Sequence, residues 1–74
     1  WEGYTMRLSA RNQLKGTVTA IKEGMVEAQV TVDIGGGQTI VSVITADSVK
    51  NLGLRVGSPV VAVVKADNVM IGVE

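Results

Sequence analysis

The sequence predicts an all-β fold, a small five-stranded barrel with one short helix between the third and fourth strands. Residues 25–34 (MVEAQVTVDI) alternate strictly between apolar and polar side chains, which is typical of a half-buried antiparallel strand. Other segments rich in β-branched residues are separated by short polar or glycine-containing turns. A chain of 74 residues is long enough for one domain with a small core.

The first three strands follow from this alternation and from glycine turns. We expect residues 14–22 to form the first strand, joined through a turn at residues 22–24 to the second strand over residues 25–34. The glycines at residues 35–37 break the second strand, and residues 38–45 form the third. The face of the second strand that we expect to turn toward the core consists of Val26, Ala28, Val30, Val32 and Ile34.

The second half of the chain begins with a helix and ends with two strands. A helix is expected over residues 46–52, because capping residue types stand at its start and Gly53 stands where it would end. Residues 59–65 form the fourth strand and residues 68–73 a closing fifth strand, which together fit a barrel of the oligonucleotide/oligosaccharide-binding (OB) type. Because residues 60–64 are apolar on both faces, we expect a second subunit to cover one of them.

Composition excludes several classes of function. The chain contains neither cysteine nor histidine, so it has no disulfide and lacks the usual ligands of zinc and other transition metals. Seven basic and seven acidic residues give a net charge of zero, without the basic stripe of a duplex-binding protein. The longest apolar run, residues 60–64, is far shorter than the ~20 residues of a membrane span. A domain this small is expected to gain stability by self-association.

The first residues do not resemble a signal peptide, because they lack a charged start followed by an apolar core. We expect Met6 to be the natural initiator and residues 1–6 to be a disordered leader or the product of an upstream start. Residues 7–74 then form a single domain of a cytoplasmic protein.

Catalysis and phosphate binding by a glycine loop are disfavoured. The carboxylates show no arrangement suited to acid–base chemistry, and no histidine is present to activate a serine. The glycines at residues 35–37 are followed by a strand and by no lysine, so they indicate a hairpin turn rather than a phosphate-binding loop.

An arginine surrounded by small polar residues stands near the start of the domain, in LSARNQLKG (residues 8–16). Ser9 and Asn12 add side-chain donors, and the small Ala10 lets a ligand approach the backbone. The guanidinium group of Arg11 carries five N–H donors in a fork that suits the oxygen atoms of an anion. No Asp or Glu lies within seven residues of it. An ordinary surface arginine at the start of a strand is the alternative.

Further donors lie elsewhere in the chain. Thr45 and Ser48 stand at the start of the predicted helix, where free N–H groups favour an anion, and simple N-capping is their alternative role. Lys65 ends the most apolar strand, either as a strand terminus reaching solvent or as a charge in a half-buried pocket. Asp67 favours a local ion pair with this lysine.

Three segments resemble the molbindin (Mop) family of small molybdate-binding proteins with a TOBE-like domain: SARNQLKGTV, SVITADSVKNLGL and AVVKADNVMIGV. The resemblance covers residues 7–73. It implies an OB-type barrel that assembles as a hexamer, a trimer of dimers, and binds tetrahedral oxyanions at subunit interfaces. The same domain recurs in molybdate-responsive regulators and on transporter ATPases.

The resemblance also implies the ligand and its contacts. The ligand would be molybdate or tungstate, with no organic cofactor and no cationic metal. Arg11 and Lys65 would neutralise the dianion, converging across neighbouring subunits. Family members often carry serine where Ala66 stands, so Ala66 would offer only its backbone N–H. The ligand-binding residues that match the family's motifs are Ser9, Ala10, Arg11, Asn12, Thr45, Ser48, Lys65 and Ala66.

The predicted function is therefore molybdate binding for molybdenum storage and homeostasis, without catalysis and without a nucleic-acid or membrane partner. One alternative is a regulatory or assembly module of a molybdate transporter or a molybdate-responsive regulator, in which the bound anion controls contacts with a partner. A single-stranded nucleic-acid binder is a third hypothesis, and it lacks stacking platforms because the only aromatic residues are Trp1 and Tyr4.

Overall fold

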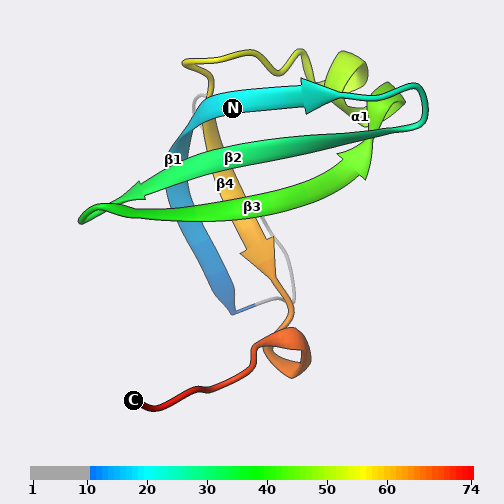
Figure 1. The fold of residues 1–74 in the computed structure, drawn as a ribbon. Helices are drawn as coiled ribbons and strands as arrows, with labels where there is room; N and C mark the ends of the chain where they lie inside the picture. The colour runs from blue at the N-terminus through cyan, green and yellow to red at the C-terminus, as the bar shows by residue number, and fades with distance from the viewer. Residues whose placement is uncertain (1–10) are drawn as a thin grey trace.

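The computed structural model describes residues 11–74, which are built on four antiparallel strands and one helix (Figure 1). The strands form one sheet in the order β3-β2-β1-β4, which curls into half of a barrel. The all-β prediction with a helix between the third and fourth strands is confirmed. The leader expected over residues 1–6 lies outside the described residues. The elements are β1 (Asn12–Glu23), β2 (Glu27–Gly35), β3 (Gln38–Thr45), α1 (Ala46–Leu52), β4 (Pro59–Val64) and a 3-10 turn, η1 (Ala66–Asn68).

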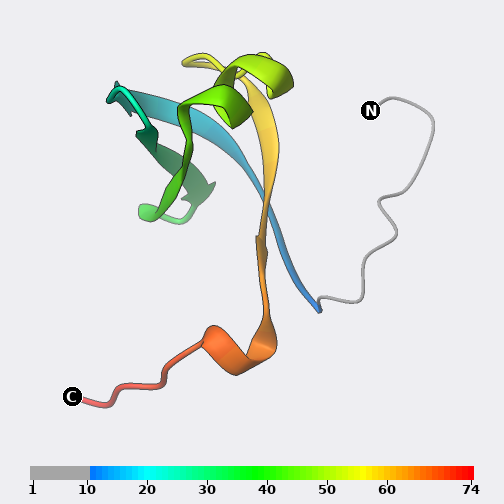
Figure 2. The ribbon, with the colours of Figure 1, turned by 90° about the vertical axis from the view of Figure 1, so that its right-hand side faces the viewer.

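The long strand β1 belongs to both halves of the sheet. Its first half pairs with β4, from Asn12 opposite Val64 to Thr17 opposite Pro59. Its second half pairs with β2, from Thr17 to Glu23. β1 therefore lies between the β2–β3 hairpin and β4 in the sheet, and it bends between its two halves (Figures 1 and 2).

The bend in β1 needs a glycine at residue 16. A Cβ atom on Gly16 would lie 2.5 Å from the backbone oxygen of Asp33 and 2.7 Å from Cγ1 of Val32, both on β2. The pairing with β2 is also irregular between Val18 and Ala20, and an irregularity of this kind increases the local twist. Together these features let β1 pass from β4 to β2 without losing either partner.

The core lies inside the curl of the sheet. Three of its members are alternate residues of β2, which confirms the face expected from the sequence. Val26 was expected on the same face but is 74% exposed. It precedes β2, and its carbonyl accepts a hydrogen bond from the N–H of Ala46 at 2.8 Å. Ile34 packs against the core while remaining partly exposed. The buried residues are Val18, Ala28, Val30, Val32 and Val49.

The helix and the glycine turn follow local signals. Helix α1 begins and ends where the sequence predicts, with Thr45 as its N-cap and Gly53 in the left-handed conformation after its last residue. The glycines at residues 35–37 all have positive φ, and the carboxylate of Asp33 accepts a hydrogen bond from the N–H of Gly35 at 2.8 Å. This stretch connects β2 to β3 and is a hairpin turn, as expected.

The fifth strand predicted over residues 68–73 does not join the sheet. After β4 the chain forms the turn η1, and residues 69–74 then lead away from the four strands (Figures 1 and 2). A strand requires a neighbouring strand for its backbone groups, and this segment pairs with no strand within residues 11–74. The half-barrel is consequently open between β3 and β4, and it has four strands where five were expected.

Candidate functional site

Two of the predicted anion ligands flank one end of the β1–β4 ladder. Asn12, the first residue of β1, lies opposite Val64, the last residue of β4. Arg11 directly precedes Asn12, and Lys65 directly follows Val64. Opposite residues of an antiparallel pair have Cα atoms about 5 Å apart, so the backbones of Arg11 and Lys65, one residue beyond this pair, lie near each other. Within one chain their backbones lie side by side, and the expected convergence of the two cations across neighbouring subunits stays a prediction.

No neighbouring carboxylate neutralises these cations in the described part of the chain. Arg11 and Lys65 are exposed and form no ion pair with residues 11–74, so the ion pair suggested between Lys65 and Asp67 is not formed. Within the same residues, the N–H of Ala66 has no hydrogen-bond partner. This end of the ladder therefore presents two positive charges and a free backbone donor.

Thr45 and Ser48 form a second cluster at the start of α1. The hydroxyl of Thr45 donates to Oγ of Ser48 at 2.7 Å, and the N–H of Ser48 donates to Oγ1 of Thr45 at 3.0 Å. The capping role considered for this pair is thus confirmed. Because Oγ of Ser48 accepts the Thr45 proton, the Ser48 hydroxyl keeps its own proton for another acceptor.

Removing the cap should destabilise the domain. Thr45→Ala is expected to lower the free energy of unfolding by about 1 kcal/mol, because the N–H of Ser48 loses its acceptor. Thr45→Ser keeps a hydroxyl in the capping position and should remain within a few tenths of a kcal/mol of the wild type. Urea denaturation followed by circular dichroism measures both variants. Equal losses for alanine and serine would contradict the capping role.

The two clusters lie at opposite ends of the sheet. Thr45 pairs with Glu27 at the start of β2, close to Glu23, where β1 ends, whereas Arg11 precedes the start of β1. Since β1 has twelve residues and a strand rises about 3.3 Å per residue, side chains at its two ends cannot reach a common small ligand (Figure 1). One chain therefore cannot gather all the predicted ligands around one anion.

A further polar residue follows the first cluster on β1, and two of the predicted site residues lie outside the described part of the chain. Gln13 follows Asn12 on β1 and lies opposite Val63. Its place in the same polar stretch of sequence is the one signal that pointed to it. Ser9 and Ala10 lie outside the described residues, so their assignment stays a prediction.

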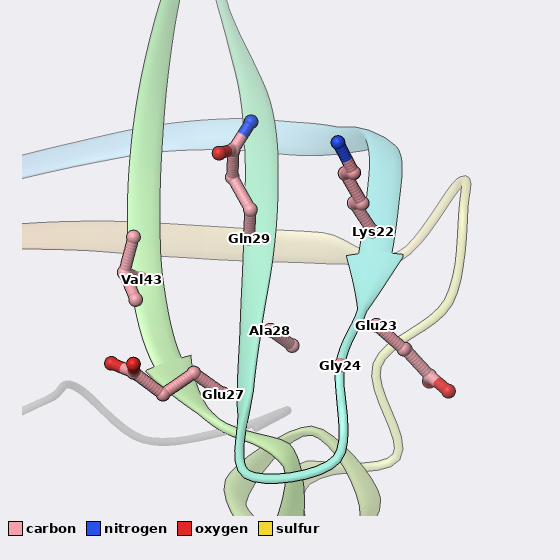
Figure 3. A pocket seen from close by; sticks show the side chains of 7 residues that line it. All are labelled: Lys22, Glu23, Gly24, Glu27, Ala28, Gln29 and Val43. Atoms are coloured by element: carbon pink, nitrogen blue, oxygen red, sulfur yellow. The ribbon is translucent and has the colours of Figure 1, made fainter.

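An open hollow of about 280 Å³ lies beside the hairpin that joins β1 to β2 (Figure 3). Lys22 and Gln29 line it from neighbouring strands, together with the carboxyl side chains of Glu23 and Glu27. One cation near two carboxylates does not concentrate positive charge, which an anion site requires. None of the predicted ligands lines this hollow.

Metal-ligand clusters and membrane-spanning helices were the two other features sought among residues 11–74. Within residues 11–74, no three side chains of the metal-ligating types His, Cys, Asp and Glu cluster together. The helices of the same region are too short or too polar to cross a bilayer. The two predicted clusters supply cationic, hydroxyl and backbone N–H donors at the ends of strands and at the start of α1.

Comparison with known proteins assigns the chain to a family. The TOBE domain family matches residues 8–71. The chain belongs to the TOBE domain family. Within it, the Mop resemblance is confirmed: a probable molybdenum-pterin-binding protein of Haemophilus influenzae is 51% identical over 69 residues, which cover 93% of this chain and 100% of the relative.

Two solved structures share the fold of this TOBE domain. MopII from Clostridium pasteurianum superimposes with a TM-score of 0.85 at 49% identity, covering 90% of this chain and 100% of that chain. ModG, described as a cytoplasmic molybdate-binding protein and solved with molybdate bound, gives a TM-score of 0.88 at 50% identity. That match covers 97% of this chain and 50% of the ModG chain.

Proposed function

We propose that this TOBE domain binds molybdate, or tungstate, and serves molybdenum storage and homeostasis in the cytoplasm without catalysing a reaction. The proposal is supported by Arg11 and Lys65, which flank the same end of the β1–β4 ladder and form no ion pair with any carboxylate of residues 11–74. The 50% identity to ModG, whose structure contains molybdate, supports the choice of ligand. The relatives are named for binding, which supports a binding role rather than catalysis.

The charges suit a tetrahedral dianion. Arg11 would contribute a planar fork of N–H donors and Lys65 an ammonium group, and together they would balance two negative charges. Each hydrogen bond to a charged group contributes about 1.5–3 kcal/mol. About four to six such bonds, less the costs of ordering and desolvation, give a net binding free energy of about −8 kcal/mol, or a micromolar Kd.

The complete site requires more than one copy of the chain, because its two donor clusters lie at opposite ends of the sheet. A hexamer built as a trimer of dimers would bring these ends together at the interfaces between copies. In this assembly one copy would supply Ser9, Ala10, Arg11, Asn12, Lys65 and Ala66, and another would supply Thr45 and Ser48.

Titration calorimetry with molybdate, tungstate and sulfate tests this function. We expect a Kd of about 1 μM or tighter for molybdate or tungstate. Sulfate has the same charge and shape but is smaller, so its affinity should be weaker by at least about tenfold in a cavity fitted to the larger anion. Native mass spectrometry of the same sample should give a hexamer. No binding of either molybdate or tungstate would refute the proposal.

A further inference from the structure

Asp67 carries a negative charge close to the two cations and has no partner within residues 11–74. It is the middle residue of η1, and it is exposed. Its carboxylate forms no hydrogen bond and no ion pair with the described chain, and η1 has no side-chain cap. The described fold therefore does not depend on this carboxylate, and its effect on a bound anion is the one to consider.

Asp67 is close to the cations whichever way its side chain turns. Consecutive Cα atoms are about 3.8 Å apart, so the Cα atoms of Asp67 and Lys65 are separated by at most about 7.6 Å. Arg11 lies at the same end of the β1–β4 ladder as Lys65. A charge acts through space without contact. At about 8 Å it lies inside the Debye length, which is about 10 Å at 0.1 M salt.

Asp33 offers a comparison, because it lies far from both cations. It pairs with Thr17 on β1, and Arg11 lies six residues before Thr17, about 20 Å along the strand. Thr17 also pairs with Pro59, which lies six residues before Lys65 on the other strand. The charge of Asp33 is therefore about two Debye lengths from either cation and is largely screened at 0.1 M salt.

We propose that Asp67 lowers the affinity of the site for a dianion and keeps the bound oxyanion exchangeable. Arg11 and Lys65 carry two positive charges, and Asp67 offsets one of them. A bound dianion then leaves one negative charge uncompensated, which favours its release. The inference rests on the proposed function, because it requires that Arg11 and Lys65 hold the anion. In a storage protein, this repulsion makes bound molybdate available again when its free concentration falls.

Coulomb's law gives the size of the effect. A carboxylate and a dianion about 8 Å apart in water repel each other by an amount that corresponds to about a sixfold change in affinity. Screening at about 10 mM salt, where the Debye length is about 30 Å, reduces this change to about fourfold. At about 1 M salt the Debye length is about 3 Å, and the repulsion nearly vanishes. The effect of Asp67 should therefore disappear with added salt, which a purely structural effect would not do.

Neutralising Asp67 should tighten anion binding. We expect Asp67→Asn to lower the Kd for molybdate by about fourfold at about 10 mM salt, and by less than about 1.5-fold at about 1 M salt. Asp67→Glu keeps the negative charge, so its Kd should stay within about twofold of the wild type at both salt concentrations. Titration calorimetry measures the affinities. Native mass spectrometry and circular dichroism check that each variant keeps its assembly and fold.

Asp33→Asn is the matched control. It makes the same substitution about 20 Å from both cations, and the amide oxygen of asparagine can still accept the hydrogen bond from the N–H of Gly35. Its Kd for molybdate should stay within about twofold of the wild type at both salt concentrations.

Three outcomes would overturn the role of Asp67: wild-type affinity in Asp67→Asn at low salt, a gain that persists at about 1 M salt, or an equal gain in Asp67→Glu. The proposed function fails separately. If the wild type binds molybdate and Asp67→Asn binds it equally well, the function stands and the role of Asp67 does not. If the wild type binds neither molybdate nor tungstate while Asp67→Asn binds them, the reverse holds. Absence of binding in both proteins refutes both proposals.

Discussion

Replacing Arg11 or Lys65 with alanine is expected to weaken molybdate binding by about 10- to 100-fold in each variant. Each change removes charge-assisted hydrogen bonds worth about 1.5–3 kcal/mol and leaves one charge of the dianion unbalanced. Both side chains are exposed and form no ion pair within residues 11–74, so the β fold should survive their loss. Titration calorimetry measures the affinity, and circular dichroism monitors the fold.

Lys15→Ala is the matched control for these variants. Lys15 is an exposed cation on the same strand, four residues beyond Arg11 and so about 13 Å along β1. A charge at that distance is largely screened at ordinary salt concentrations, where the Debye length is about 10 Å. Its affinity for molybdate should therefore stay within about twofold of the wild type. Wild-type affinity in both Arg11→Ala and Lys65→Ala would remove the basis of the proposed site.

Gly16→Ala is expected to lower the free energy of unfolding by at least about 2 kcal/mol. The added Cβ would lie 2.5 Å from the backbone oxygen of Asp33. A shift of that carbonyl would disturb the pairing of β1 with β2. At about 0.05–0.15 kcal/mol per residue, a 74-residue domain has a total stability of about 4–11 kcal/mol. The loss is therefore a large share of the whole, and urea denaturation measures it.

Gly72→Ala serves as the control for this change. A Cβ on Gly72 would meet nothing within 4 Å, so the unfolding free energy should change by less than about 0.5 kcal/mol. Wild type and variants must be compared at equal protein concentration, because self-association adds to the apparent stability. If Gly16→Ala unfolds at the same urea concentration as Gly72→Ala, the close approach of β1 and β2 does not constrain residue 16.

The elements defined by local signals agree well with the sequence prediction. Helix α1 has the predicted bounds, because Thr45 and Gly53 fix its ends through contacts within a few residues. β3 also has the predicted bounds, between the glycine turn at residues 35–37 and the cap of the helix. In these cases the information that decides the structure lies inside the segment itself.

The elements defined by distant partners were harder to predict. β1 begins at Asn12 rather than Leu14. Its first residues are polar and show no alternation, but they pair with β4. Val26 fits the alternation of β2 but lies before the strand, where its carbonyl is bonded to Ala46. The segment at residues 69–73 has the composition of a strand, yet composition does not say which edge, or which chain, a strand joins.

The same distinction applies to the candidate site. Residue types made Arg11, Lys65, Thr45 and Ser48 candidate anion donors beside plainer alternatives, and only the resemblance to the Mop family favoured the anion role, which stays a prediction. The spatial relations of these four residues depend on the β1–β4 register, which pairs the two ends of the domain. No periodic pattern in the sequence indicates this pairing. For this reason neither the adjacency of the two cations in one chain nor the separation of the hydroxyl pair from them was foreseen.

The register of β1 with β4 has a consequence for maturation of the protein. The two hairpins join neighbours in sequence, but residue 12 reaches residue 64 only after almost the whole chain has been traversed. Because short loops close more readily than long ones, we expect Arg11 and Lys65 to become adjacent late in folding. An oxyanion held by both residues would bind the folded domain and not partly folded chains, and it would shift the folding equilibrium toward the folded domain. Molybdenum supply and the yield of mature protein would then depend on each other.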